Sequence, residues 1–180
     1  GIATAKKDGH LVLIDTLGNI VSELKGAGYG MLYFDSGGFS VFYKEESGMG
    51  VINRNGKIIL EPKYSSVEPF SNGYAAVQIS AGDDGVKSGF IDTTGQFVFG
   101  RTFGLIRGFE QGYAAVEIGG KWGLIDTTDK LVIENKYDDI TGYQDGLCIV
   151  GIKKGKRMKY GFMDPSGQWV LKPVYNEAWF

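Results

Sequence analysis

The sequence predicts an all-β protein built from five tandem antiparallel β-repeat units, and three observations support this prediction. A tract of two apolar residues followed by Asp or Asn recurs at steps of 38, 39, 34 and 38 residues. Short apolar runs alternate with turn residues, and no segment has the periodicity of an amphipathic helix. The 29 glycines have no collagen-like period, so we expect them at turns and close strand approaches.

The recurring tract ends in a turn sequence that begins with Asp or Asn and has Gly at its fourth position in four units. The five copies are 13–18, 51–56, 90–95, 124–129 and 162–167. This pattern is typical of a type I turn followed by a left-handed residue, in which the Asp side chain accepts hydrogen bonds from backbone N–H groups. Pro165 fits the second position because its φ is preset, and Asp129 is a residue type that tolerates the left-handed region. We therefore interpret the recurring Asp as a turn residue and not as a catalytic acid.

A second marker runs in register with the first and divides the chain into units. It is an aromatic residue followed three positions later by Gly, at Phe34, Phe70, Phe109 and Tyr143, and Gly1 fits the same place. Counting from the marker glycine gives one repeat domain, 1–180, with units of 34–39 residues: 1–36, 37–72, 73–111, 112–145 and 146–180.

Within the fourth unit we expect four strands. The pattern predicts strands over 113–118, 121–126 and 130–134, and a weaker fourth strand over 137–143. A unit of this size cannot bury an apolar face alone, so the core must form between neighbouring units.

The units resemble the bacterial WG repeat, also called the KWG repeat. The shared pattern is aromatic-Gly-x-Ile-Asp-x-x-Gly, an apolar strand, Lys-Tyr, and then Phe-x-x-Gly, and the best matches are 121–137 and 160–175. Only Trp122 and Tyr160 supply the aromatic residue before Gly, and in the first unit Val12 replaces the Gly itself. The resemblance implies a binding or surface module rather than an enzyme, and a bacterial envelope or secreted location.

Two arrangements of the units are open at this point. In a closed five-bladed β-propeller each unit is one blade, whereas in an open β-hairpin solenoid the units stack into a ribbon. The strand after the marker glycine contains small residues, among them Ala75, Ala114 and Cys148, as a crowded central axis would require. The ring is therefore favoured, with the solenoid as the alternative.

Composition excludes several classes of function. The net charge of -2 argues against a nucleic-acid-binding protein, and no apolar run has the length of a membrane span. A single Cys148 and a single His10 leave no internal disulfide and no cysteine or histidine metal cluster. No nucleophile, phosphate-loop or dinucleotide motif occurs in a strand-turn-helix setting, so neither an enzymatic activity nor a cofactor is expected.

Candidate binding residues lie in the variable loops and among the tryptophans. The connection between the first two strands of a unit is basic in the fifth unit and acidic in the third. The candidates are Lys153, Lys154, Lys156, Arg157 and Lys159 in the basic loop, Asp83 and Asp84 in the acidic loop, and Trp169 and Trp179 as exposed anchors. A cluster of cations suits an acidic or anionic partner, and two carboxylates are too few for a calcium site.

The sequence thus predicts a non-catalytic protein-interaction or scaffold module. The alternative is a cell-envelope or glycan-binding module that uses exposed aromatic rings, and a more distant one is a glycan-acting enzyme on a propeller. Exposed tryptophans in one groove would favour the glycan hypothesis, and buried tryptophans would weaken it. The oligomeric state does not follow from the sequence.

Overall fold

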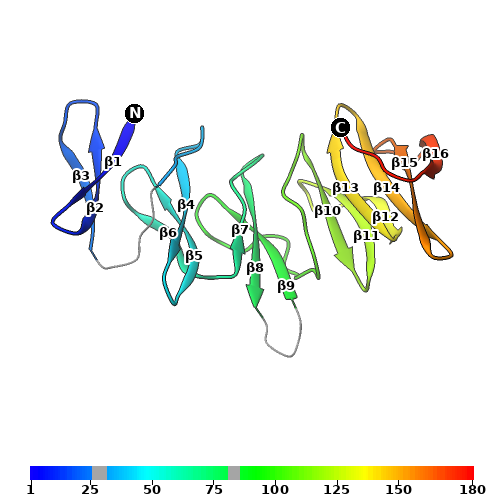
Figure 1. The fold of residues 1–180 in the computed structure, drawn as a ribbon, viewed down its shortest axis with the longest axis horizontal. Helices are drawn as coiled ribbons and strands as arrows, with labels where there is room; N and C mark the ends of the chain where they lie inside the picture. The colour runs from blue at the N-terminus through cyan, green and yellow to red at the C-terminus, as the bar shows by residue number, and fades with distance from the viewer. Residues whose placement is uncertain (26–31, 81–85) are drawn as a thin grey trace.

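The computed structural model describes residues 1–25, 32–80 and 86–180, and these residues form an all-β structure (Figure 1). None of them is helical, so no membrane-spanning helix occurs in the described ranges. Five separate antiparallel sheets follow one another along the chain, as the repeat pattern predicted.

The strands group into sheets in sequence order. The first sheet contains β1 (Ile2–Lys7), β2 (His10–Asp15) and β3 (Ile20–Leu24), the second β4 (Phe39–Lys44), β5 (Gly48–Asn53) and β6 (Ile58–Tyr64), and the third β7 (Ser66–Val67), β8 (Tyr74–Ser80) and β9 (Val86–Asp92). The fourth contains β10 (Tyr113–Ile118), β11 (Lys121–Asp126) and β12 (Leu131–Tyr137), and the fifth β13 (Asp139–Gln144), β14 (Leu147–Lys154), β15 (Arg157–Met163) and β16 (Trp169–Tyr175).

The fourth strand of a unit belongs to the sheet of the next unit. β13 follows β12 in the chain but pairs with β14, and β7 pairs with β8 in the same way. Between the third and fourth units an isolated bridge joins Ile106 to Val116 on β10. The predicted fourth strand therefore exists after the second and fourth units, and its backbone hydrogen bonds are with the sheet of the next unit.

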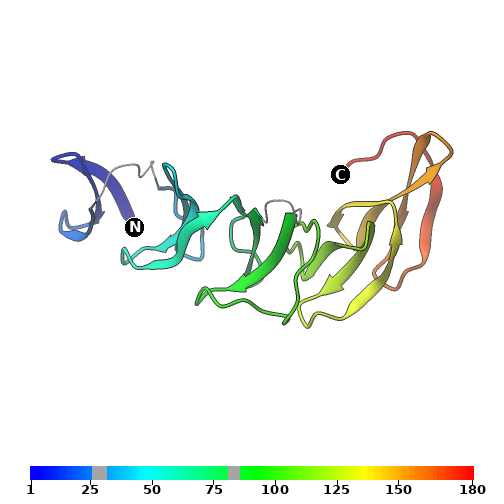
Figure 2. The same ribbon diagram turned by 90° about the horizontal axis from the view of Figure 1, so that it is seen from below.

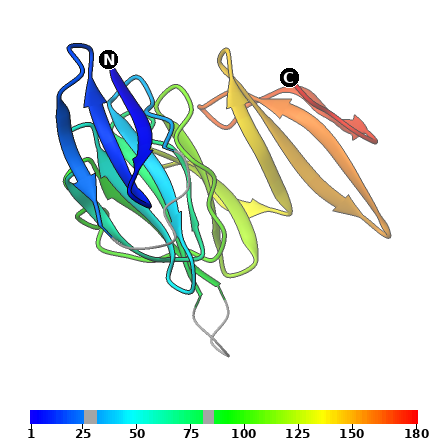
Figure 3. The same cartoon turned by 60° about the vertical axis from the view of Figure 1, so that its left-hand side comes forward.

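The five sheets form an open, curved row in which the first and last sheets lie at opposite ends (Figures 1 and 2). Neighbouring sheets stack face to face, as propeller blades do, but the described residues of the two end sheets do not meet as closure of a ring would require. In the view with the N-terminal end forward, the blue to green sheets overlap in depth, and the orange and red strands of the fifth sheet lie to one side (Figure 3).

The core lies between the sheets in four clusters, one at each junction. Side chains on a strand alternate between its two faces, so each inner sheet contributes to two clusters. Ala114 packs in the cluster with Phe90 and Phe109, whereas Ala115 packs in the next cluster with Cys148. Small residues are therefore needed at these positions because large side chains from a neighbouring unit pack on them. This explanation does not require the crowded central axis of a propeller.

The predicted turns after the second strand are confirmed in all five units. In the fourth unit, Asp126 Oδ1 accepts hydrogen bonds from Thr128 N at 2.8 Å and Lys130 N at 3.1 Å. Asp15, Asn53, Asp92 and Asp164 accept the two corresponding bonds. The fourth turn residue has positive φ in each case, including Asp129 at 66°.

We expect these turns to make the protein sensitive to acid. Side-chain hydrogen bonds, from Asn19 to Asp15 and from Thr94, Thr128 and Ser166 to the other three carboxylates, lower the pKa of Asp15, Asp92, Asp126 and Asp164 from their ordinary value. A lowered pKa in the folded state gives stability that is present above the unfolded pKa, ordinarily 3.8, and is lost as pH falls through the folded pKa. The melting temperature of the protein should therefore decrease as the pH is lowered below about 4.

The control for this prediction is a variant in which the four aspartates are replaced by asparagine, the residue that the second unit has naturally at Asn53. Asparagine keeps the turn hydrogen bonds but does not titrate. Its melting temperature should depend less on pH in the acid range, and an equal acid loss in both proteins would contradict the role of the turns.

The glycine of the aromatic-Gly pair lies beneath a bulge in the third strand. Trp122 pairs with Tyr137 and Leu124 with Ile133, so one residue on β11 stands opposite three on β12. A Cβ on Gly123 would lie 2.8 Å from the Ile133 carbonyl oxygen. In the first unit Val12 occupies this position, and there the ladder runs one to one from Leu11 to Leu13. The glycine therefore allows the bulged backbone to approach closely.

Cys148 is fully buried on β14. Burial raises the pKa of its thiol from 9.0 to about 12. Because of this raised pKa, the thiolate fraction at pH 8 should be roughly 1,000-fold lower than for an exposed cysteine. The thiolate is the form that reacts with alkylating reagents. We expect iodoacetamide to label the native protein far more slowly than the urea-unfolded protein, as followed by mass spectrometry. Equal rates would show that β14 is not buried in solution.

Candidate functional site

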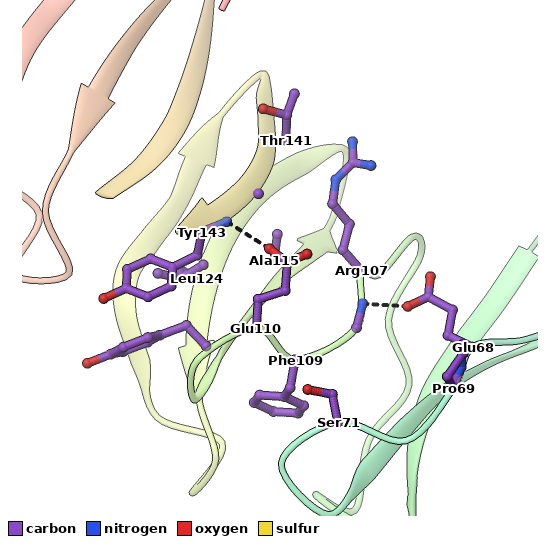
Figure 4. Close-up of a pocket in the computed structure, with 13 residues that line it drawn as sticks. Glu68, Pro69, Ser71, Arg107, Phe109, Glu110, Ala115, Leu124, Thr141 and Tyr143 are labelled. Carbon is purple, nitrogen blue, oxygen red and sulfur yellow. Dashed lines mark hydrogen bonds between the residues drawn. The ribbon is translucent and has the colours of Figure 1, made fainter. Parts of the chain in front are cut away.

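A cleft of about 500 Å³ lies where the third, fourth and fifth sheets and the segments that lead into them meet (Figure 4). Its apolar wall comes from Phe109, Tyr113, Leu124 and Tyr143, which lie on the connecting segment, β10, β11 and β13. Tyr113 and Tyr143 pack against each other with ring centroids 4.6 Å apart. Burial raises the pKa of the Tyr143 hydroxyl, which therefore remains protonated at neutral pH.

Polar side chains surround the opening of this cleft. Glu68 Oε2 accepts a hydrogen bond from Gly108 N at 2.8 Å, and Glu110 Oε2 accepts one from Tyr143 N at 3.3 Å (Figure 4). Arg107 donates from Nε to the Ile140 carbonyl at 2.9 Å. These bonds join consecutive connecting segments across the cleft.

The guanidinium of Arg107 is also held by two further groups. It lies 3.5 Å from Asp139 Oδ1 and 5.1 Å from the centre of the Trp122 ring. With Arg107 partly neutralised by Asp139, the carboxylates of Glu68 and Glu110 give the opening an acidic character.

A second cleft of about 400 Å³ occupies the equivalent place between the second and third sheets. In the repeat alignment, six residues that line the second cleft are equivalent to six that line the first. The pairs are Phe34 and Phe109, Asp35 and Glu110, Phe39 and Tyr113, Val41 and Ala115, Val51 and Leu124, and Phe70 and Tyr143. The cleft is therefore a property of the repeat and recurs along the row.

At the intervening junction, between the third and fourth units, aromatic rings fill the equivalent space. Phe90 stands where the fourth unit has Leu124, and Phe99 where it has Ile133. The ring centroid of Phe90 lies 4.9 Å from that of Phe109 and 5.7 Å from that of Phe99, and Tyr74 packs 5.4 Å from Phe99. Two replacements of an aliphatic by an aromatic residue, Phe90 for Leu124 and Phe99 for Ile133, thus distinguish the filled junction from the open cleft.

Hydrogen bonds between consecutive marker turns fix the spacing of the cleft walls. Asn72 Oδ1 accepts from Gly112 N at 3.3 Å, and Gln111 Oε1 accepts from Asp145 N at 3.1 Å. The left-handed glycine of the second unit's turn is Gly38, one residue after Gly37, to which the sequence marker was assigned. The walls are therefore held by backbone and side-chain contacts that are independent of any ligand.

The basic loop is the hairpin that connects β14 and β15. Lys153, Lys154, Lys156 and Arg157 are exposed, and Lys159 is half-buried. The ammonium groups of Lys154 and Lys159 donate to carbonyl oxygens of Pro173 and Val174, both at 3.2 Å. Two cations of the loop thus stabilise β16, whereas Lys156 and Arg157 extend from the hairpin tip.

The tryptophans do not form a shared groove. Trp122 is buried, and Trp169 packs on the core cluster of the fourth and fifth units, 6.0 Å from the Tyr137 ring. Only Trp179 is an exposed ring, at 74%. The prediction that Trp169 is an exposed anchor is wrong, because its position is equivalent to Leu131, which faces the preceding unit.

Two other sequence candidates have different outcomes. Asp83 and Asp84 lie outside the described residues. His10 begins β2, and its Nδ1 is buried without a hydrogen-bond partner in the described part of the chain. Within the described ranges no three His, Cys, Asp or Glu side chains gather in an arrangement that could hold a metal ion.

Sequence reasoning missed the clefts, because each is lined by residues from consecutive units that are far apart in the chain. The signal was nevertheless present in the repeat alignment, where Val51 and Leu124 are smaller than Phe90 at one core position. A smaller residue at a position that faces the next unit indicates space at that junction.

Comparisons with solved structures find similar chains. BamB from Moraxella catarrhalis is 13% identical with a TM-score of 0.43, over 96% of this chain and 70% of that chain. A functionally unknown protein from Desulfotomaculum acetoxidans is 17% identical with a TM-score of 0.42, over 95% of this chain and 64% of that chain. A comparison with curated proteins gives no match.

A comparison with protein families matches the WG containing repeat four times. The matched residues are 49–80, 89–122, 122–156 and 160–180, which together exceed half of the chain. The matches begin at the second unit, in agreement with the erosion of the pattern in the first unit. The chain belongs to the WG-repeat family.

Proposed function

We propose that this chain is a non-catalytic protein-interaction module that binds extended peptide segments of a partner in its recurrent clefts. The observation that carries this proposal is the repetition of one aromatic-lined cleft at two junctions of the row. Repeat proteins commonly bind partners along such extended surfaces.

The cleft chemistry indicates the kind of peptide. Phe109, Tyr113, Leu124 and Tyr143 provide an apolar wall for one aliphatic or aromatic side chain. Glu68 and Glu110 at the opening favour a Lys or Arg next to that residue, because opposite charges across an interface steer binding. The preferred ligand is therefore an extended segment with an apolar residue beside a basic one.

Three features support peptide binding over the glycan alternative. The rings of Tyr113 and Tyr143 pack on each other instead of presenting free faces to a sugar. Trp122 and Trp169 are engaged in the core. The two acidic side chains at the cleft also accept backbone hydrogen bonds, which is a structural use of the carboxylates and supports a non-catalytic role.

The test is a selection of random peptides of about 12 residues, displayed on phage, on the immobilised protein. We expect the selected peptides to share an apolar residue next to Lys or Arg. Binding of a selected synthetic peptide should weaken at least about tenfold in Leu124→Phe, because this substitution copies the ring with which Phe90 fills the equivalent space. The melting temperature of the variant checks that it folds.

The matched control changes Lys156→Gln and Arg157→Gln at the hairpin tip, which does not line the cleft. This variant should bind the peptide as the unmodified protein does. If the control loses binding and Leu124→Phe retains it, the charged hairpin is the site and the cleft proposal fails. If no peptide consensus emerges and a polysaccharide binds instead, the glycan alternative replaces it.

A further inference from the structure

The two clefts share a wall. Pro69 lines both of them, because it lies on segment 68–71, which borders the second cleft on one side and the first cleft on the other. In the same segment, Phe70 lines the second cleft, and Glu68 and Ser71 line the first. The clefts are therefore neighbouring parts of one surface.

The segments that line this surface follow one another in the order of the sheets. They are 33–35, 68–71, 107–110 and 141–143. The second cleft lies between the first two segments, and the first cleft extends from the second segment to the fourth. Figure 4 shows Pro69 on one side of Arg107 and Tyr143 on the other. Together the clefts form one groove that crosses four consecutive segments.

Segment 68–71 offers an apolar crossing between the two clefts. Pro69 is exposed and has no backbone N–H group. The N–H groups of Glu68 and Ser71 donate to carbonyl oxygens of β8 at 2.9 and 2.8 Å. A ligand chain that crosses the segment therefore contacts the proline ring and leaves none of these three residues with an unpaired donor.

Each cleft has the walls to hold one apolar side chain. Each is lined by a buried aliphatic residue, Val51 in the second cleft and Leu124 in the first. Each also has a pair of packed rings with centroids 4.6 Å apart, which are Phe39 and Phe70 in the second cleft and Tyr113 and Tyr143 in the first.

The charges of the two clefts differ. Of the described residues that line the second cleft, only Asp35 is charged, and its Oδ1 accepts a hydrogen bond from Phe39 N at 2.9 Å. The first cleft has the carboxylates of Glu68 and Glu110. Because Glu68 lies on the shared segment, a basic residue of a ligand is best placed between the two apolar side chains.

The spacing of the sheets sets the separation of those two side chains. Packed sheets lie about 10 Å apart, and the clefts are two junctions apart, so their apolar walls are about 20 Å apart. An extended chain advances about 3.3 Å per residue, so about six residues cover this distance. Side chains alternate along an extended chain, and residues i and i+6 therefore point to the same face.

We propose that one extended peptide occupies both clefts at once and crosses Pro69, with two apolar side chains six residues apart and a Lys or Arg between them. This inference rests on the proposed peptide-binding function and goes beyond it by specifying the ligand. Once one apolar side chain is bound, the second binds within the same complex, so the affinity should exceed that of either side chain alone.

The experiment measures the binding of labelled synthetic peptides by fluorescence anisotropy and their stoichiometry by isothermal titration calorimetry. Each peptide has Ser and Thr around one Phe-Lys or Lys-Phe pair. A second Phe is absent, or it lies two, four, six or eight residues from the first with the Lys between them. We expect the separation of six to bind at least about tenfold more tightly than the one-Phe peptide, with one peptide per protein.

Variants of the second cleft test where the second Phe binds. Val51→Phe copies Phe90, the equivalent residue of the filled junction, and should remove the gain while the one-Phe peptide binds as before. Because Val51 is fully buried, Tyr33→Ala is a second variant at a cleft residue that is 76% exposed, and it should reduce the gain at least about threefold. Tyr43→Ala, 55% exposed on β4 and outside both clefts, is the control and should keep the gain. Melting temperatures check that each variant folds.

Three results would overturn the proposal, and they separate it from the proposed function. If Leu124→Phe weakens binding of the one-Phe peptide but a second Phe adds less than about twofold at every separation, the two-cleft ligand is wrong and the peptide-binding function stands. If the gain persists in both Val51→Phe and Tyr33→Ala, the second Phe binds outside the second cleft. If neither one-Phe nor two-Phe peptides bind, both proposals fail.

Discussion

Replacing Gly123 with alanine is expected to destabilise the protein by about 3 kcal/mol, at the upper end of the cost of overpacking a tight site. The added Cβ would lie 2.8 Å from the Ile133 carbonyl oxygen and 2.9 Å from Asn135 N. Both atoms belong to the backbone of the bulged β12, so a rotamer change cannot relieve the contact. The bulge must open, and the pairing of Trp122 with Tyr137 would be lost with it.

Urea denaturation measures this loss, and Gly142→Ala is the matched control. Gly142 lies in β13, its φ is not in the left-handed region, and an added Cβ would meet its nearest neighbour at an ordinary 3.6 Å. The control should change the free energy of unfolding by less than about 1 kcal/mol. Similar losses in both variants would mean that the bulge is not the reason for the glycine.

Gly95→Val is expected to cost about 3 kcal/mol for two separable reasons. The φ of Gly95 is +86°, a region in which a β-branched residue is strained by about 1–2 kcal/mol. A Cβ at this position would also lie 2.3 Å from the Ile59 carbonyl oxygen of the preceding unit. The substitution therefore strains the turn and separates two sheets.

Gly167→Val isolates the first of these effects. Gly167 has a φ of +82° in the equivalent turn of the fifth unit, and no atom lies within 4 Å of an added Cβ. It should lose only the turn strain, so the difference between the two variants in urea denaturation measures the contact between units. Equal losses would contradict the close approach of the Gly95 turn to β6, and losses no larger than at an exposed surface site would contradict the hairpin turns.

Both predictions concern required glycines, but the sequence alone indicates the requirement for only one of them. The glycine of the Asp turn follows from local chemistry, because a type I turn followed by a left-handed residue has a recognisable pattern. The glycine of the aromatic-Gly pair has no such local signal, since its φ is ordinary. Its reason is the backbone of another strand, which only the structure places above it.

The strands show the same division. The first two strands of the fourth unit, Tyr113–Ile118 and Lys121–Asp126, have the predicted bounds, because alternation and turn residues are local signals. The third strand runs to Tyr137, beyond the predicted 134, because the bulge interrupts its alternation. The partner of β13 was not predictable, since a short strand can pair with its own unit or with the next.

The candidate site was predictable only in part. The basic hairpin was identified from composition, but two of its lysines donate to carbonyl oxygens near β16, and sequence does not distinguish such contacts from exposed charge. The clefts required the alignment of units in three dimensions. The side chains at two core positions, Leu124 and Ile133 in one unit and Phe90 and Phe99 in another, distinguish an open from a filled space between two sheets, and their effect depends on the distance between those sheets.

By itself the sequence determined the number of units, their turns, their strand content and the family, because these follow from periodicities and from hydrogen bonds within a few residues. The tertiary structure decided the pairing of the fourth strand with the next sheet, the open row and the recurrent clefts. These depend on the angle and spacing between neighbouring sheets. Many weak contacts between residues distant in the chain set that geometry, and no single residue type encodes it.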